Sequence, residues 1–425
     1  MGFSDTIAAL SSGRPPAAIA VIRTSGPGAK AAANALAGSL PPPREATLRT
    51  LYDPRSRTEL DSVMILCFDA PRSATGEDIV EYQCHGGRAV VAAILDALTS
   101  LGLRQAEPGE FTRRALVNGR IDMIQAEGLA DLLEAETESQ RQAALAFAGG
   151  LLSCQVDIWQ SRILDLSARA EAAIDYVGDE DETATDTSAL CRDALALATE
   201  LDTWLARPRT ERLKDGIRVV IAGPPNAGKS SLVNALAGAD RAIVTDIPGT
   251  TRDSIEVPLA IEGVPVVLID TAGLRETTDA VETIGVARAR SEAKRAEILL
   301  WLGDLADAPT HPHLLLIATK SDLGEPVVKG ALSVSALTGS GIPQLLGMLG
   351  TVASSLFPAE GEVSLNRRQA TAVADAADQL RTASTDLLLL AESLRSSRVA
   401  FDRLTGRAGV EDAIDALFSR FCLGK

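Results

Sequence analysis

A glycine-rich segment near the middle of the chain has the residue types and spacing of a phosphate-binding loop. Residues 223–230 read Gly-Pro-Pro-Asn-Ala-Gly-Lys-Ser and fit the pattern GxxxxGK[ST], between a strand-like apolar run and a helix-like run. Glycines allow backbone N–H groups to close around phosphate oxygens, and the N-terminus of the following helix adds partial positive charge. We expect Lys229 to reach the β- and γ-phosphates and the Ser230 hydroxyl to bind Mg²⁺.

Further motifs typical of a guanine-nucleotide switch follow in order. Asp270 ends a predicted strand and opens the sequence Asp-Thr-Ala-Gly, which brings a carboxylate near Mg²⁺. Thr251 lies in the preceding loop, where its hydroxyl would join the Mg²⁺ shell only while the γ-phosphate is present. Asp322 follows another predicted strand and can accept both N–H donors that guanine has and adenine lacks. The pattern predicts a GTP-hydrolysing domain, in which the nucleotide contacts are Asn226, Ala227, Gly228, Lys229, Ser230, Ser231, Thr245, Asp246, Ile247, Pro248, Gly249, Thr250, Thr251, Asp270, Thr271, Ala272, Gly273, Thr319, Lys320, Asp322, Ser335, Ala336 and Leu337.

The base-reading motif departs from its usual form, Asn-Lys-x-Asp, at the first position. Thr319 stands where asparagine is usual. Threonine keeps a hydroxyl but lacks the amide that braces the phosphate loop. We therefore expect guanine selectivity to persist through Asp322, and nucleotide affinity to be the property that changes.

The residue that orients the attacking water is not the glutamine of small signalling GTPases, because Leu274 stands at that position. Arg275, Glu276 and Glu282 are nearby alternatives, and each is also compatible with a solvated charge. Positive charge at the leaving oxygen can come from an arginine finger, or from a monovalent cation held by Asn226 and the carbonyls of residues 245–250. The sequence leaves both sources open.

Three composition zones indicate the domain organisation. Residues 1–118 mix short apolar runs with Gly and Pro, which predicts an α+β domain with strands at 17–22 and 62–68 and a helix over 88–101. Residues 119–213 and 353–425 have helical apolar spacing, and the two halves of a bundle need each other to bury their apolar stripes. Between them, residues 214–352 alternate helices with five expected strands, at 217–222, 264–269, 298–302, 314–319 and 331–334. This pattern predicts a Ras-like α/β P-loop GTPase domain, with a doubly wound, mostly parallel sheet, inserted into an all-α helical domain.

Composition excludes several other classes of protein. The chain has 425 residues, 46% of them hydrophobic, which suffices for buried cores. Its net charge of −16 disfavours sequence-blind binding to nucleic acid, although Arg113-Arg114 and Arg367-Arg368 are candidate contacts for one particular RNA. Five scattered cysteines without a CxxC pair indicate neither a disulfide framework nor a zinc site. With no leader-like N-terminus or long apolar stretch, we expect a reduced cytoplasmic chain that does not contact a membrane.

Taken as a set of motifs, the sequence resembles the bacterial and organellar MnmE family, also called TrmE, of tRNA-modification GTPases. The likeness covers almost the whole chain. It includes Asp-Thr-Ile-Ala-Ala at 5–9, Thr-Gly-Glu-Asp at 75–78, Glu-Pro-Gly-Glu-Phe-Thr-Arg-Arg-Ala at 107–115 and Asn-Gly-Arg-Ile-Asp at 118–122. The final residues 421–425, Phe-Cys-Leu-Gly-Lys, are similar to the family's C-terminal Cys-x-Gly-Lys signature.

The resemblance implies how the hydrolysis and the modification are carried out. It implies a homodimer whose G domains meet in a potassium-dependent way, with Glu282 as the catalytic, water-orienting residue. It also implies an FAD-containing partner, MnmG, in a heterotetramer that modifies C5 of the wobble uridine in certain tRNAs. The metal ligands implied are Ser230 and Thr251 for Mg²⁺, and Asn226, Thr245, Ile247 and Thr250 for K⁺.

The resemblance further implies that the N-terminal domain binds a formyl- or methylene-tetrahydrofolate as one-carbon donor and dimerises. By motif match, the folate-binding positions are Arg23, Glu81, Arg120 and Lys425. Taken without the family, Arg23 is as compatible with a surface ion pair and Arg120 with a solvated charge. One departure is Gly-Arg-Pro-Pro-Ala-Ala at 13–18, where prolines remove N–H donors from a segment that is glycine-rich in the family.

Two other classes of function remain as alternatives. A ribosome-assembly GTPase would act as an RNA-binding switch, but such proteins usually append a basic domain and this chain is acidic overall. A metabolic folate enzyme with a regulatory nucleotide domain would need a nucleophile or an acid–base cluster, and none is evident in residues 1–118.

Overall fold

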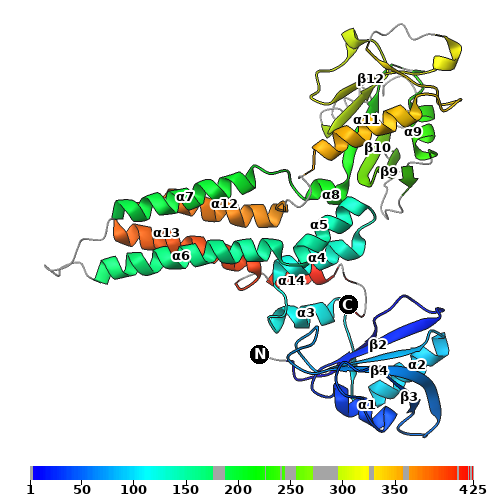
Figure 1. Cartoon of the computed structure of the whole chain (residues 1–425), viewed down its shortest axis with the longest axis vertical. Coiled ribbons are helices and arrows are strands. Elements are labelled where there is room, and N and C mark those ends of the chain that lie inside the picture. Colours follow the sequence, from blue (N-terminus) through cyan, green and yellow to red (C-terminus); the bar gives the residue numbers. More distant parts are fainter. Residues whose placement is uncertain are drawn as a thin grey trace, which may run out of the picture. The chain divides into compact units, whose positions relative to one another are not determined.

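The computed structural model (Figure 1) describes residues 3–175, 187–224, 226–239, 242–244, 255–270, 295–324, 330–357, 363–408, 411–419, 421 and 424. The chain forms two units, one made of Met1–Ala130 and Asp402–Lys425 and the other of Asp131–Phe401. Each unit is described by itself below.

The first unit contains a six-stranded sheet in the order β3-β4-β5-β2-β1-β6. Its pairs are antiparallel except for the parallel pair of β1 and β6. Strands expected at 17–22 and 62–68 correspond to β2 and β4, and the expected helix over 88–101 is α2. The elements are β1 (Ile7–Leu10), β2 (Ile19–Ser25), α1 (Ala29–Ala37), β3 (Thr47–Tyr52), β4 (Glu59–Phe68), β5 (Ile79–His85), α2 (Arg88–Ser100), β6 (Arg104–Gln105), α3 (Glu110–Val117), the start of α4 (Met123–Glu134) and α14 (Glu411–Phe418).

Successive side chains along each strand point to opposite faces of this sheet, and the two faces have different surroundings. Ile22, Ile65 and Tyr82 are fully buried in one core with Leu36 of α1 and Ile94 of α2. On the opposite face, Ile7 and Ala9 of β1 pack against Phe111 of α3. The C-terminal end of the chain completes this unit, because Phe418 and Phe421 are buried with Met123 and Ala126 of α4.

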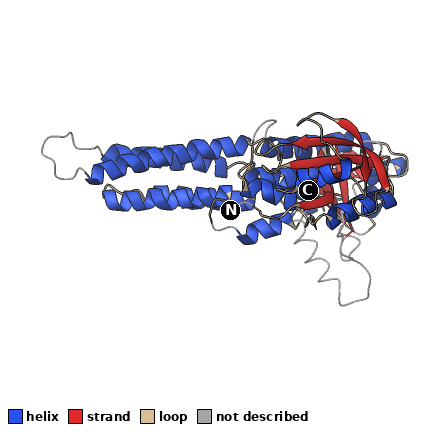
Figure 2. Ribbon diagram, turned by 90° about the horizontal axis from the view of Figure 1, so that it is seen from below, coloured by secondary structure: helices blue, strands red, loops and turns tan. Residues whose placement is uncertain are grey.

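The second unit contains long helices and a seven-stranded sheet in the order β13-β12-β11-β7-β10-β9-β8. In Figure 2 the long helices run alongside one another, and α7 lies next to both α6 and α12. The elements are α5 (Glu138–Ala148), α6 (Leu151–Asp175), α7 (Thr187–Leu205), α8 (Glu211–Asp215), β7 (Ile217–Ala222), α9 (Lys229–Ala237), β8 (Ala242–Val244), β9 (Ile255–Ile261), β10 (Val264–Asp270), β11 (Ile298–Trp301), the 3₁₀ turns η1 (Leu305–Asp307) and η2 (Ser321–Leu323), β12 (Leu314–Ala318), β13 (Leu332–Ser333), α11 (Ile342–Ser355), α12 (Arg367–Arg381) and α13 (Leu387–Thr405).

The fold class expected from the sequence is confirmed: an α+β part, a helical part, and an α/β sheet placed between helices that pack together. The five expected strands of the sheet correspond to β7, β10, β11, β12 and β13, which pair in parallel. The sequence analysis did not anticipate β8 and β9, which add an antiparallel edge. Glu262 and Gly263 join β9 to β10 with positive φ at both positions, as tight two-residue hairpin turns require.

Trp159 of α6 forms the centre of the helical core. Its side chain is fully buried, and its ring packs edge-on against Trp204 and tilted against Phe401, with centroid distances of 5.2 and 5.7 Å. Its Nε1–H donates to Glu200 Oε1 at 2.9 Å, so the only polar atom of the side chain is satisfied.

We predict that Trp159→Ala lowers the free energy of unfolding of the second unit by about 3–5 kcal/mol, because it leaves a large cavity among aromatic neighbours. Urea-induced unfolding followed by circular dichroism measures this loss. The matched control is Leu164→Ala on the same helix, where the side chain is 49% exposed and the expected change is within about 0.5 kcal/mol. Equal losses in the two variants would contradict a core centred on Trp159.

Candidate functional site

The phosphate-binding loop connects the end of β7 to the start of α9. Gly223 has φ +152°, and a Cβ at this position would lie 2.6 Å from the backbone oxygen of Leu302, so only glycine fits beside β11. Gly228, with φ +88°, immediately precedes Lys229, the first residue of α9. The loop therefore aims the N-terminus of α9 at the site predicted for the phosphates.

Lys229 is held over this loop. Its Nζ donates to the backbone oxygens of Gly223 at 3.0 Å and Pro224 at 2.8 Å, and the side chain is buried. Asn226 adopts φ +60°, a left-handed conformation that asparagine tolerates better than most residues. The predicted phosphate-binding lysine is thus already positioned inside the curve of the loop.

Two oxygen-bearing side chains from different elements meet at the start of α9. The Ser230 hydroxyl donates to Asp270 Oδ2 at 2.6 Å, and Asp270, at the end of β10, is 1% exposed. Because β7 and β10 are adjacent and parallel, their carboxyl ends lie at the same edge of the sheet. A hydroxyl and a carboxylate in contact are hard oxygen donors of the kind that Mg²⁺ prefers, so this pair fits the predicted metal.

Thr319 braces the phosphate loop through its hydroxyl. Thr319 Oγ1 donates to the backbone oxygen of Ala227 at 2.6 Å, and Lys320 Nζ donates to that of Asn226 at 2.9 Å. From the sequence, threonine keeps a hydroxyl but lacks the amide of the usual asparagine, and the expected change in nucleotide affinity stays a prediction. The structure adds that the shorter side chain still reaches the loop from the end of β12 through that hydroxyl.

The carboxylate of Asp322, predicted to read the base, is oriented by a buried hydroxyl. Ser335 is fully buried, and its Oγ donates to Asp322 Oδ1 at 2.6 Å while accepting from the N–H of Thr338 at 3.2 Å. Ala336 and the 85% exposed Leu337 follow directly, and Ser231 lies exposed on α9. The structure therefore brings the loop after β13 beside the aspartate predicted to read guanine.

Several predicted residues lie outside the part of the chain that the structure describes. They are the catalytic Glu282, the loop residues Thr245, Asp246, Ile247, Pro248, Gly249, Thr250 and Thr251, the residues Thr271, Ala272 and Gly273 after Asp270, and the C-terminal Lys425.

In the first unit, two of the predicted folate-binding residues are cross-strand neighbours. Arg23 of β2 lies opposite Glu81 of β5, and its Nε and Nη2 atoms contact Glu81 Oε1 at 2.9 and 2.7 Å. The Arg23 guanidinium also lies 5.7 Å from the centroid of the Phe111 ring of α3. Arg120 lies just beyond the end of α3, where its N–H donates to the backbone oxygen of Ala115 at 2.8 Å.

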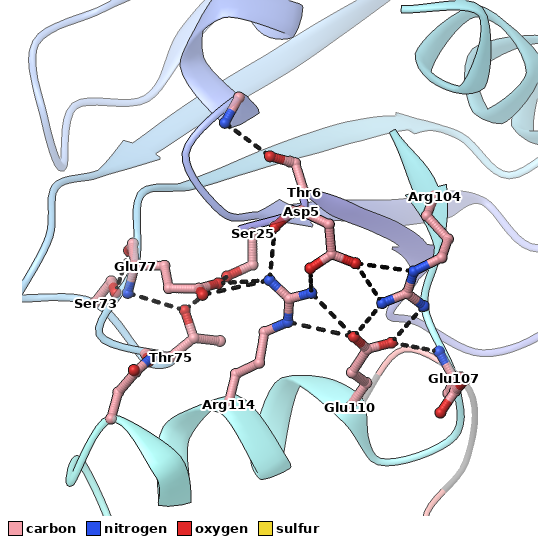
Figure 3. Close-up of polar contacts among 12 residues, drawn as sticks. Asp5, Thr6, Ser25, Ser73, Thr75, Glu77, Arg104, Glu107, Glu110 and Arg114 are labelled. Carbon is pink, nitrogen blue, oxygen red and sulfur yellow. Dashed lines mark hydrogen bonds and ion pairs between the residues drawn. The ribbon is translucent and has the colours of Figure 1, made fainter. Parts of the chain in front are cut away.

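The same unit contains a charge cluster centred on the buried Arg114 (Figure 3). Arg114 of α3 is fully buried and contacts three carboxylates: Asp5 Oδ1 at 2.8 Å, Glu110 Oε1 at 3.0 Å and Glu77 Oε2 at 3.1 Å. Arg104 adds contacts to Asp5 at 2.7 Å and Glu110 at 2.6 Å. Arg114 was a candidate RNA contact from sequence, and its burial rules that role out.

The carboxylates of Asp5 and Glu110 are held in their charged form. Burial alone would raise the pKa of Asp5 and of Glu110, but hydrogen bonds from Arg104 together with interactions with Arg114 outweigh it, so folding lowers both pKa values. Sequence reasoning missed this cluster. Its only signal was the helical spacing of Glu110 and Arg114, which places both on one face of α3.

The fold and the nucleotide site together define the class of proteins to which this chain belongs. A mostly parallel α/β sheet carries a phosphate loop, a Ser–Asp oxygen pair and the aspartate predicted to read guanine at one edge, which is the arrangement of the P-loop guanine-nucleotide-binding proteins.

Comparisons with known proteins identify the family within this class. Residues 6–120 match the family model described as GTP-binding protein TrmE N-terminus, and residues 123–422 match that of the MnmE helical domain. Proteins named tRNA modification GTPase MnmE are similar over their whole length. That of Erythrobacter litoralis is 53% identical (99% of this chain, 100% of that protein), and that of Novosphingobium aromaticivorans is 52% identical (100% of both). That of Zymomonas mobilis is 50% identical (99% of this chain, 100% of that protein).

The chain belongs to the MnmE family of tRNA modification GTPases. Among the described residues, none of the helices combines the length and apolar character needed to cross a bilayer.

We predict that Thr319→Val weakens GDP binding roughly tenfold, because it leaves the Ala227 oxygen without the hydroxyl that braces it. Titration with a fluorescent GDP analogue measures the affinity. Thr319→Ser keeps the hydroxyl and is expected to bind within about twofold of the parent chain. Unchanged affinity in the valine variant would show that the brace does not contribute to binding.

We predict that Arg104→Gln raises the pH at which the first unit unfolds in acid. The stability that Asp5 and Glu110 contribute is complete above their ordinary pKa values of 3.8 and 4.5, and it is lost as pH falls through the lowered values. Without Arg104, folding lowers those two pKa values less, so the carboxylates contribute less stability and the unit unfolds at a higher pH.

Pepsin cleavage within residues 3–130, mapped by mass spectrometry between pH 2 and 5, follows this unit alone. Arg395→Gln removes an exposed pair with Glu392 in the second unit and serves as the control, with no expected change. An unmoved midpoint for Arg104→Gln would exclude the cluster as a source of acid stability.

Proposed function

We propose that this chain hydrolyses GTP during modification of the wobble uridine of tRNA at C5. In this proposal a tetrahydrofolate derivative supplies one carbon, and an FAD-containing MnmG protein acts as the partner that completes installation of an aminomethyl-type group. The proposal that the chain hydrolyses GTP is supported chiefly by one observation. The Ser230 hydroxyl contacts the buried Asp270 carboxylate at 2.6 Å, beside Lys229. The role in tRNA modification follows from membership of the family.

The geometry of the described residues supports the following proposed nucleotide-binding steps. The N–H groups at the start of α9 and the Lys229 ammonium bind the phosphates, and Asp322 accepts the N–H donors of guanine. Ser230 and Asp270 would hold Mg²⁺ together with Thr251, and the ion when bound neutralises charge on the phosphate oxygens. Asn226, with Thr245, Ile247 and Thr250, would hold K⁺ when two G domains meet, and Glu282 would orient the attacking water.

The donor set of the first unit supports a site for a tetrahydrofolate derivative. Both bonds from Arg23 end on Glu81 Oε1, so within the described residues Oε2 remains available to N–H donors of a pterin ring. Gly424 brings the chain end to β1, because a Cβ at Gly424 would lie 2.0 Å from the backbone oxygen of Leu10. Ala9 of β1 pairs with Arg23, which supports the proposed role of Lys425 at the same site.

Exposed apolar side chains on β2, β3 and β4 of the N-terminal sheet support the proposed homodimer. Leu48 of β3 and Met64 of β4 are directly paired across the strands and are 64% and 40% exposed. Ile19 at the start of β2 is 62% exposed. Apolar side chains gathered on an open sheet face are typical of surfaces that a second chain covers.

We predict that GTP turnover is several-fold faster in potassium chloride than in sodium chloride of equal ionic strength, because K⁺ would neutralise phosphate charge between two G domains. The same assay on Glu282→Ala is expected to lose most of this stimulation, whereas Glu276→Ala, on the same segment, is expected to keep it. Equal rates in both salts would reject the potassium site. Loss of the stimulation in both variants would reject the specific role of Glu282.

A further inference from the structure

The first turn of α5 contacts the closed end of the β9–β10 hairpin. Ser139 donates from both its N–H and its hydroxyl to the backbone oxygen of Gly263, at 3.3 and 2.9 Å. Gly263 and Glu262 form the turn of the hairpin, and a Cβ on Gly263 would lie 3.7 Å from the Cβ of Glu138. The first N–H groups of a helix have no partner within the helix, and the hairpin supplies one of them here.

The next residue of α5 is bonded to the segment that leads into a second strand of the same sheet. Gln140 Nε2 donates to the backbone oxygen of Leu213 at 2.9 Å. Leu213 is on α8, which ends at Asp215, and β7 begins at Ile217. α5 and α8 contact each other, and both contact β10 (Figure 1). Two consecutive residues of one helix therefore hold the segments from which β10 and β7 start.

These two strands carry the nucleotide site at their other ends. β7 leads into the phosphate loop, which is followed by Ser230 on α9, and β10 ends at Asp270. The contact between the Ser230 hydroxyl and the Asp270 carboxylate at 2.6 Å thus joins the ends of two strands that pair in parallel. A displacement of β10 relative to β7 changes the separation of these two side chains.

The surroundings of β10 make it able to transmit such a displacement. All seven residues of the strand are buried, and it is paired with β7 on one side and with β9 on the other. A close-packed interior has low compressibility and transmits strain to its neighbours. A displacement of Asp270 at one end of β10 is therefore expected to reach Gly263 beyond the other end, and the reverse is expected as well.

We infer that Ser139 and Gln140 are positioning residues for the nucleotide site, which they adjust from the helical part of the chain by holding the starts of β10 and β7. Ser139 acts on Asp270 through β10, and Gln140 acts on the phosphate loop through β7. Coupling between two sites is reciprocal, so the bound nucleotide also changes the strength of the contacts at α5. The inference rests on the nucleotide site and is independent of the proposed folate and tRNA roles.

The test is the ratio of the affinities for GDP and for the non-hydrolysable GTP analogue GMPPNP, measured by calorimetry on the full chain. Ser139→Ala removes the hydroxyl donor to Gly263. Gln140→Glu removes the donor to Leu213 and keeps the side-chain oxygen that caps the start of α5. Each variant is expected to change the affinity ratio at least about threefold, because the lost hydrogen bond differs in strength between the two nucleotide complexes.

Two further variants serve as controls. Ser139→Thr keeps the hydroxyl and is expected to keep the affinity ratio of the unaltered chain. Ser355→Ala removes a hydroxyl that donates to Val352 within α11 at 2.7 Å, and no change in the ratio is expected because that bond joins no two elements. Circular dichroism verifies that each variant is folded, and the Ser139 variants decide the question if Gln140→Glu is not.

A second measurement follows the contact itself in the unaltered chain. The N–H of Ser139 donates to Gly263, so its rate of hydrogen exchange reports whether that bond is closed. Mass spectrometry of peptides spanning residues 136–142 is expected to show exchange rates that differ at least about threefold between the GDP and GMPPNP complexes.

The outcomes separate the inference from the nucleotide site on which it rests. Failure of the unaltered chain to bind either nucleotide would reject the site, and the inference with it. If Ser139→Ala and Gln140→Glu weakened GDP and GMPPNP by the same factor, the two residues would only stabilise the fold and the inference would be overturned. Equal hydrogen exchange at residues 136–142 in the two complexes would overturn it as well, because the contact would then not respond to the nucleotide.

Discussion

The first unit depends on burial of the Arg114 guanidinium. A buried charge without partners costs about 3–5 kcal/mol, so the segments that supply its partners must fold in register with α3. Asp5 precedes β1, Glu77 lies before β5, and Glu110 is one turn away on α3 itself. One side chain thereby fixes the start of the chain, the turn before β5 and the helix that ends at the candidate folate site.

The nucleotide site depends on a different constraint, the common direction of the parallel strands. β7, β10 and β12 all end at one edge of the sheet, which is why the phosphate loop, Asp270 and Thr319 come together although about 100 residues separate the first from the last. Each of these contacts joins residues that follow different strands of the sheet. The conformation of the phosphate loop therefore depends on contacts with residues at other strand ends as well as on the loop's own sequence.

Motifs that depend on local spacing could be predicted from the sequence. The phosphate loop, Asp270 and Asp322 lie where the strand-then-helix pattern placed them, because strand ends and glycine turns are set by neighbouring residues. The hydroxyl brace of Thr319 and the burial of Arg114 could not be predicted in the same way. Each depends on the approach of segments distant in sequence, and a basic pair such as Arg113-Arg114 gives no sign that one member turns inward. The antiparallel edge strands β8 and β9 were missed for a similar reason, since edge strands lack the continuous apolar run of a central strand.

The route of the chain through the two units has a consequence for its synthesis. Thr210 before the inserted sheet is bonded to Leu365 after it, and Asp202 of α7 pairs with Arg381 of α12, so α6 and α7 emerge from the ribosome without the helix that covers them. The first unit is completed even later in synthesis. Phe421 completes its helical core, and Gly424 packs against the backbone of Leu10. The helical core around Met123 is thus completed only after the last residues are made, and a truncated chain exposes an apolar surface that chaperones and proteases bind.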